Sequence, residues 1–545
     1  MTTAIRPPET VDATIPAEEE SPAAEATTRP QPAPLDVARL RAAIDEILSR
    51  HATVGFALGV VREGHLAFFH GHGFADIEAR TPITEDTVFR IASISKTFTA
   101  IAVMQLWEQG LVDLDAPAND YLRAFRLVGA DPAFRPATIR HLLTHTAGIP
   151  EVVRPTDLLR PDWGDSIPLG EPMPTLARFY GEHIRLETEP GTAFAYTNHA
   201  FAALGQIVED VSGIPIDRYL RQRIFEPLGM FDTDLLRSEF LGPRLATGYT
   251  LGRNGPEPVA VRDWVPAAAA SVCSTTRDMA RYVAALAGGG TNDHGTILRP
   301  DTLSMMFRPA FQPETRVPGM GLGFDRHPIA DHEVIGHGGI LPGFNSQLFV
   351  APDDGVGVIA LTTGGRLAML WLPTEISRLL GVILGVPEAR IRTDVPQRPE
   401  VWSDICGRYR FTGRITDIRA RLMTGAGAVV SVDGDGLLLR FLSPIPALLR
   451  GFRLVPDDPE DPYVFRIDLA RFGLSTARIV FGRDELGVTG MHADIVPMAL
   501  RKVVEPTEPR EVASPFVRAL ALSMAATAAV AAGRRLAARR RRPAA

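Results

Sequence analysis

Residues 91–100 read Ile91-Ala92-Ser93-Ile94-Ser95-Lys96-Thr97-Phe98-Thr99-Ala100. A serine and a lysine three positions apart share one face of a helix. Lys96 and Lys502 are the only two lysines in 545 residues. A lysine amine can lose its proton when it is desolvated, whereas a guanidinium cannot. The stretch therefore indicates an S-x-x-K motif, a serine nucleophile with an amine base beside it. The alternative is a surface lysine beside a helix-capping serine.

The chain around this motif is long enough for more than one domain. It is 45% hydrophobic with a net charge of -7, so composition gives no argument for nucleic-acid binding. Cys273 and Cys406 lie too far apart in sequence to suggest a disulfide framework or a thiolate metal site. His141 and His145 are four apart, but Leu142 stands where H-E-x-x-H needs glutamate. We therefore expect neither a metal nor another cofactor.

The two ends of the chain differ from its middle in composition. Residues 1–34 are rich in Pro, Ala, Thr and Glu without an apolar signal segment, which predicts disorder and a cytoplasmic location. Residues 506–545 form an Ala-rich stretch followed by arginines. We expect a soluble or peripheral helix whose basic end contacts anionic lipid, and a single membrane anchor is the alternative.

Apolar periodicity predicts one domain over residues 35–392. A helix at 35–49 and a β-hairpin of 55–61 and 66–74 precede the Ser93 helix, which continues to Gly110. Further helices are predicted at about 138–146, 175–184, 198–212, 216–225, 275–288, 300–306 and 373–384. Strands are predicted at 334–336, 345–351 and 355–362. Strands from both ends with helices between them indicate an α+β fold, an antiparallel sheet flanked by helices with an inserted helical subdomain.

Residues 393–505 have a different pattern. Short apolar strands alternate with turns such as Asp433-Gly434-Asp435-Gly436, which is typical of a small all-β barrel or sandwich. The region carries no chemical motif. Its expected role is to pack on the first domain or to shape access to its cleft.

Three further segments strengthen the S-x-x-K signal. They are Y-x-N within Pro190–Asn198, H-x-G within Gly336-His337-Gly338-Gly339, and the helix-to-loop junction His141–Pro150. In this order and spacing they resemble the serine beta-lactamase and penicillin-binding-protein-like family, in particular its class C-type esterase and D-aminopeptidase branch. The resemblance covers roughly residues 40–385, and residues 393–505 resemble the lipocalin-like domain often appended to this family.

The resemblance implies a role for each motif residue. Ser93 would be the nucleophile, with Lys96 or Tyr196 as its base; the two would titrate as a coupled pair. Asn198 would hold Lys96 or a substrate amide. By the family pattern, the oxyanion hole would be the backbone N–H groups of Ser93 and of Ile340, beside Gly339. His145 and Thr146 are expected to brace their loop.

Two positions depart from the family pattern. Relatives that hydrolyse antibiotics carry K-T-G where this chain has His337, so a fixed positive charge for a substrate carboxylate is weakened at pH 7. This argues against an efficient beta-lactamase. Ala270-Ser271 stands where the family commonly has Gly-Gly, which affects the shape of one cleft wall.

The sequence therefore predicts a serine hydrolase that forms an acyl-enzyme on Ser93 and cleaves an ester, amide or D-amino-acid peptide bond of a small-molecule or peptide substrate. One alternative is a penicillin-binding-protein-type thioesterase or acyltransferase that releases or cyclises peptides. Another is a non-catalytic binding protein that uses the same cleft.

Overall fold

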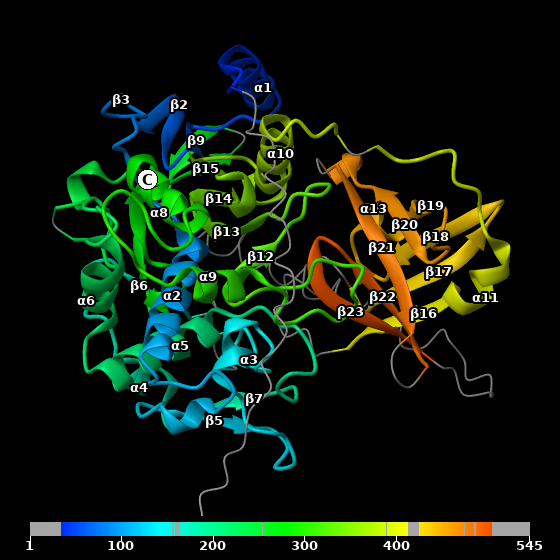
Figure 1. The fold of residues 1–545 in the computed structure, drawn as a ribbon, viewed down its shortest axis with the longest axis horizontal. Coiled ribbons are helices and arrows are strands. Elements are labelled where there is room, and N and C mark those ends of the chain that lie inside the picture. The colour runs from blue at the N-terminus through cyan, green and yellow to red at the C-terminus, as the bar shows by residue number, and fades with distance from the viewer. Residues whose placement is uncertain are drawn as a thin grey trace, which may run out of the picture. The chain divides into compact units, whose positions relative to one another are not determined.

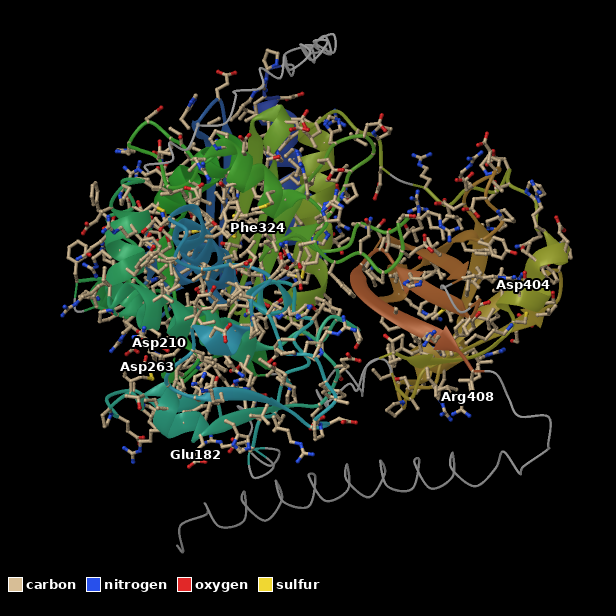
Figure 2. The ribbon with its side chains drawn as sticks, turned by 60° about the horizontal axis from the view of Figure 1, so that its bottom comes forward. Glu182, Asp210, Asp263, Phe324, Asp404 and Arg408 are labelled. Atoms are coloured by element: carbon tan, nitrogen blue, oxygen red, sulfur yellow. The ribbon has the colours of Figure 1, made fainter. Side chains whose placement is uncertain are left out.

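The structure is a computed structural model that describes residues 34–154, 157, 164–238, 240–252, 254–388, 390–412, 425–472, 475–483 and 487–503. The predictions for residues 1–34, except Pro34, and for residues 506–545 fall outside the described residues. Within them, no helix combines the length and the apolar character that crossing a bilayer requires. In Figure 2 Phe324, which is fully buried, marks the interior, and Glu182 marks the exposed periphery.

The centre of the first domain is a seven-stranded sheet in the order β12-β13-β14-β15-β1-β2-β3. The strands are β1 (Gly55–Arg62), β2 (His65–Asp76), β3 (Thr81–Pro82), β12 (Asp325–Arg326), β13 (Ile335–Leu341), β14 (Phe344–Ala351) and β15 (Val356–Thr363). β1 pairs antiparallel with β15, with Gly55 opposite Thr363. The predicted sheet built from both ends of the domain is therefore confirmed.

Helices cover this sheet and form the inserted region (Figure 1). All residues of β1 and β15 are buried, so both faces of these strands are covered. α8 packs on β1 and β15, α10 packs on β14 and β15, and α1 packs on α10. The helices are α1 (Val37–Arg50), α2 (Ser95–Glu108), α3 (Ile139–Leu143), α4 (Leu176–Tyr180), α5 (Asn198–Ser212), α6 (Ile216–Leu220), α7 (Ala267–Ala270), α8 (Thr276–Ala287), α9 (Pro300–Phe307) and α10 (Ala368–Ile383).

α2 is the most enclosed of the helices near the serine. Residues 95–104 are all buried, and the helix packs against α5 and α7. A helix that is apolar around its whole circumference needs partners on every side. The inserted region thus surrounds the helix that begins at the S-x-x-K motif.

Two predicted helices differ from the observed elements. The helix predicted at 175–184 ends at Tyr180, because Gly181 adopts a left-handed φ of 71°. Residues His183–Leu186 instead form β7, which pairs in parallel with β5 (Arg126–Gly129). The helix predicted at 216–225 is α6 followed by a π-helical turn over Arg221–Phe225.

The C-terminal region is a closed eight-stranded barrel, which confirms the prediction of a small all-β domain. Its strands are β16 (Gly407–Phe411), β17 (Ala428–Asp433), β18 (Gly436–Phe441), β19 (Phe452–Pro456), β20 (Val464–Asp468), β21 (Thr476–Arg483), β22 (Thr489–Ala493) and β23 (Val496–Lys502). β16 pairs with β23 and closes the barrel. Buried side chains including Tyr409, Leu439 and Phe465 form a continuous apolar core.

Candidate active site

Ser93 lies in a 3₁₀ turn, Ala92–Ile94, that leads directly into α2. Ala92 has φ of +51°, a left-handed conformation that is unfavourable for a residue with a Cβ. Ser95 stabilises the turn, because its Oγ donates to the Ala92 carbonyl at 2.5 Å and accepts from Val272 N at 3.0 Å. Such local strain is typical of functional sites, where the surrounding contacts hold it in place.

Lys96 is fully buried, so the alternative of a surface lysine is wrong. Its Nζ lies 3.0 Å from Ser93 Oγ, 2.8 Å from Asn198 Oδ1 and 3.0 Å from the Ala269 carbonyl oxygen. The Asn198 and Ala269 oxygens can only accept hydrogen bonds. A neutral Lys96 amine would donate its two protons to them and direct its lone pair at the Ser93 hydroxyl.

The orientation of the Asn198 amide follows from Glu151. Asn198 Nδ2 donates to Glu151 Oε1 and Asn198 N donates to Glu151 Oε2, each at 3.3 Å. Because an ionised carboxylate accepts only, Asn198 must turn its NH₂ group to Glu151 and its oxygen to Lys96. Asn198 is the first residue of α5, and the side chain of Thr197 caps this helix.

The surroundings favour the neutral form of Lys96. Burial lowers the pKa of Lys96 to about 7, although the negative charges of Glu151, Asp325 and Asp165 act in the opposite direction. The neutral amine of Lys96 is therefore accessible at neutral pH, which is where a general base is most effective.

Whereas the pKa of Lys96 is lowered, the pKa of Tyr196 is raised. Its ring lies 4.8 Å from Lys96 Nζ, and desolvation raises the pKa of its phenol well above the ordinary value, with a hydrogen bond to Ser93 acting against this. The residue as a whole is 40% exposed, so its ring also borders the open side of the site. Tyr196 is a protonated phenol at physiological pH.

The strand β13 carries the other predicted site residues. Its backbone packs against the Ser93 turn, and a Cβ at Gly339 would collide with the Ile91 carbonyl and the Ser346 hydroxyl. Ile340, the next residue, is 54% exposed. The structure thus brings Gly339 beside the serine turn.

His337 is buried on the same strand, and its ring centroid lies 6.4 Å from that of Tyr196. Burial, reinforced by the charge of Lys96, lowers the pKa of His337 to about 3. The imidazole is therefore neutral at pH 7. It cannot supply the fixed positive charge that a lysine would provide at this position.

Three contributors to the site carry no motif in the sequence. Glu151 orients Asn198, the carbonyl of Ala269 accepts from Lys96, and Val272 fixes the serine turn. Glu151 directly follows the Gly148-Ile149-Pro150 loop, and this position is the only signal that could have found it. The Ala270-Ser271 departure lies on the wall that supplies the Ala269 carbonyl.

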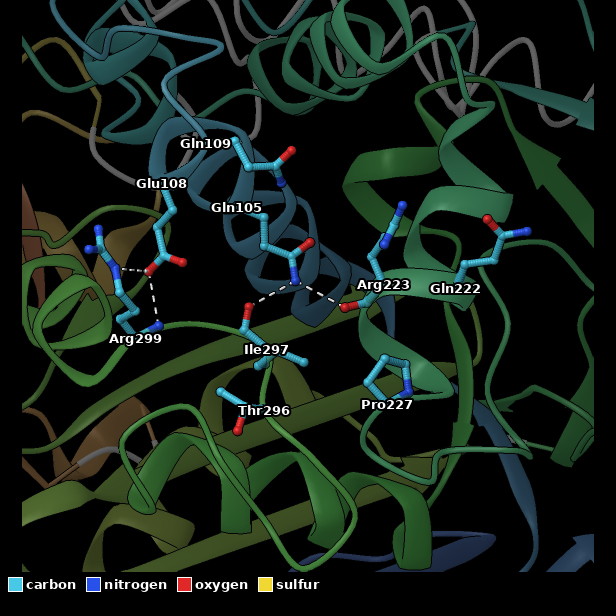
Figure 3. A pocket seen from close by; sticks show the side chains of 9 residues that line it. All are labelled: Gln105, Glu108, Gln109, Gln222, Arg223, Pro227, Thr296, Ile297 and Arg299. Carbon is cyan, nitrogen blue, oxygen red and sulfur yellow. Dashed lines mark hydrogen bonds and ion pairs between the residues drawn. The ribbon is translucent and has the colours of Figure 1, made fainter.

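A separate open cleft of about 460 Å³ lies at the opposite end of α2 (Figure 3). It is lined mostly by polar side chains from α2, from the π-helical turn and from residues 296–299, including Arg223 and an Arg299–Glu108 ion pair, together with Pro227 and Ile297. Among the described residues that line it there is no Ser, Cys or His. We therefore place the candidate chemistry at Ser93 and not in this cleft.

Comparison with known proteins agrees with this geometry. Residues 40–372, more than half of the chain, match the protein family described as Beta-lactamase. Penicillin-binding protein 4 of Amycolatopsis lactamdurans is 31% identical over 70% of this chain and 99% of its own length. Esterase EstB of Burkholderia gladioli is 30% identical over 60% of this chain and 90% of its own length. A D-aminopeptidase of Cereibacter sphaeroides is 26% identical over 77% of this chain and 74% of its own length. The chain belongs to the Beta-lactamase family.

Proposed function

We propose that the protein is a serine hydrolase that cleaves an ester or amide bond through an acyl-enzyme on Ser93. One observation carries the proposal: the Lys96 amine contacts Ser93 Oγ while its other two contacts are to obligate acceptors. The relatives named as an esterase and as a D-aminopeptidase support this reaction class.

In the proposed acylation step Lys96 takes the hydroxyl proton as Ser93 Oγ bonds to the substrate carbonyl carbon. The backbone N–H groups of Ser93 and Ile340 would stabilise the oxyanion, and one such donor typically contributes ~2.7–4 kcal/mol. The bond to the leaving alcohol or amine then breaks, and the leaving group takes a proton from Tyr196, which Lys96 reprotonates. In deacylation Lys96 accepts a proton from water and the resulting hydroxide attacks the acyl carbon. The bond between the acyl carbon and Ser93 Oγ then breaks, Lys96 returns the proton to Ser93 Oγ, and the carboxylic acid is released.

This assignment gives the base role to Lys96 and a proton-relay role to Tyr196. The pKa of Lys96 is lowered to about 7, whereas the pKa of the Tyr196 phenol is raised. A phenol with a raised pKa holds its proton until a leaving group needs it. We propose ester, amide or D-aminoacyl substrates without an essential carboxylate, since the neutral His337 offers no counter-charge.

Fluorophosphonate labelling tests the nucleophile. The wild type should be labelled and Ser93→Ala should not; equal labelling of both would refute the acyl-enzyme and favour a binding role for the cleft. Both proteins should then be assayed with short-chain esters, D- and L-aminoacyl amides, peptidyl thioesters and a chromogenic cephalosporin. Fast cephalosporin turnover with slow ester cleavage would contradict the interpretation of His337.

A further inference from the structure

His145 has an unusual backbone conformation next to the site. It follows α3 with φ of +56°, in the left-handed region that a histidine seldom adopts. In this conformation its carbonyl accepts from Ala195 N at 2.8 Å and its Nδ1 accepts from Thr197 N at 3.3 Å. The two residues that flank Tyr196 are thus both hydrogen-bonded to His145.

The His145 ring also contacts Tyr196 directly. The two ring centroids are 4.4 Å apart with the planes inclined by 32°, and Phe201 lies on the same ring at 5.1 Å. His145 is only 1% exposed. A buried aromatic ring in contact with these neighbours restricts the rotation of the Tyr196 ring.

The tautomer and charge of His145 follow from these contacts. Because Nδ1 accepts a hydrogen bond, the proton of the neutral ring is on Nε2. Burial lowers the pKa of His145 well below its ordinary value, and the positive charge of Lys96 acts in the same direction. Nε2 has no hydrogen-bond partner among the described residues. The imidazole therefore acts here as a hydrogen-bond acceptor and a packing surface, and not as an acid or a base.

We infer that His145 is a positioning residue for Tyr196: its carbonyl, its Nδ1 and its ring together fix the backbone and the ring of the tyrosine that would relay a proton at Ser93. The inference rests on the proposed function for its kinetic consequence. The strained backbone of His145 supports the positioning role, because its left-handed conformation turns both the carbonyl and the ring of His145 toward residues 195–197. A misplacement of a reacting group by ~1 Å can reduce a rate about 100-fold.

A matched pair of variants tests the inference. In His145→Asn the amide Oδ1 occupies nearly the position of Nδ1, and asparagine tolerates positive φ. In His145→Gln the same amide is one methylene further out and cannot reach Thr197 N in the same geometry. We expect kcat of the Asn variant to exceed that of the Gln variant by roughly 10-fold or more, with KM of the two within about threefold. Equal kcat values for the two variants, whether high or low, would overturn the inference.

Two further measurements separate positioning from general stability and from the proposed function. In a Tyr196→Phe background the difference between the Asn and Gln variants should disappear, because the hydroxyl that they position is gone; an undiminished difference would overturn the inference. Without any turnover, amide hydrogen exchange at Ala195 and Thr197 should be faster in His145→Gln than in His145→Asn. If this difference in exchange is present but the wild type is neither labelled by fluorophosphonate nor turns over substrate, the proposed function is refuted, whereas the positioning of residues 195–197 by His145 is still supported.

Discussion

Replacing Lys96 by arginine keeps the positive charge and removes the ability to become a neutral base. In the wild type Lys96 Nζ lies 2.8–3.0 Å from three oxygen atoms and is fully buried. A guanidinium could still donate to the Asn198 and Ala269 oxygens, but it has no lone pair for the Ser93 proton. General-base catalysis typically contributes 10²–10⁴-fold, so we expect kcat/KM to fall about 10³-fold, or ~4 kcal/mol of transition-state stabilisation.

The same substitution also introduces a larger side chain into a closed site, at a cost of roughly 1–3 kcal/mol in the free energy of unfolding. The assay should therefore combine kcat/KM for the best panel substrate with the fluorophosphonate labelling rate and the thermal unfolding midpoint. Lys502→Arg is a natural control, because the other lysine of the chain donates to the Ser403 and Asp404 carbonyls, just before the first barrel strand. It should leave kcat/KM unchanged. A folded Lys96→Arg protein with near-normal turnover would refute the role of the amine.

Further outcomes can be measured in the same assays. Because the neutral amine is the active form and the pKa of Lys96 is about 7, kcat/KM should rise with pH through this value; a flat profile from pH 5 to 9 would contradict this. Glu151→Gln removes the carboxylate that raises the pKa of Lys96 most, so the rise of kcat/KM with pH should move to lower pH in this variant. Gly339→Ala should lower kcat/KM by about 10-fold or more, because its Cβ collides with the Ile91 carbonyl oxygen, next to the serine turn, and with the Ser346 hydroxyl. At Gly338 the nearest atom that a Cβ would meet is Gln347 Oε1 at 3.0 Å, with main-chain atoms no closer than 3.9 Å, and the alanine variant should remain active. His337→Lys should raise cephalosporin turnover relative to ester turnover, and an unchanged ratio would count against the charge argument.

The parts of the fold that sequence analysis predicts are those with long regular patterns. The β1–β2 hairpin, the strands β13–β15 and the helices α1, α2 and α5 each have enough residues for a clear apolar period. The strands of two to four residues in the inserted region, such as β7, are too short for such a period to be recognised. There a single glycine, Gly181, decided between helix and strand.

The residues of the candidate site also differ in whether the sequence predicts them. Ser93, Lys96, Tyr196 and Asn198 carry side-chain chemistry at readable spacing, and the structure brings them together. The carbonyl of Ala269 could not be predicted, because every residue has a carbonyl and its use depends on a contact 173 positions away. Glu151 and His145 lie in a loop whose contacts to residues 195–198 exist only after folding. Sequence reasoning identified His145 as a loop brace but gave no indication of its contact with Tyr196.

The pairing of β1 with β15 also has a consequence for biosynthesis. Thr363, the last residue of β15, is made 270 residues after Ser93 (363 − 93 = 270). At 5–20 residues per second a ribosome needs roughly 15–55 s for this interval. For most of that time the nascent chain carries Ser93 and Lys96, and then Tyr196, without the strand β13 that packs on the serine turn. We therefore expect the geometry around Ser93, and with it the proposed reactivity toward acyl donors, to be completed only when the sheet closes, late in synthesis.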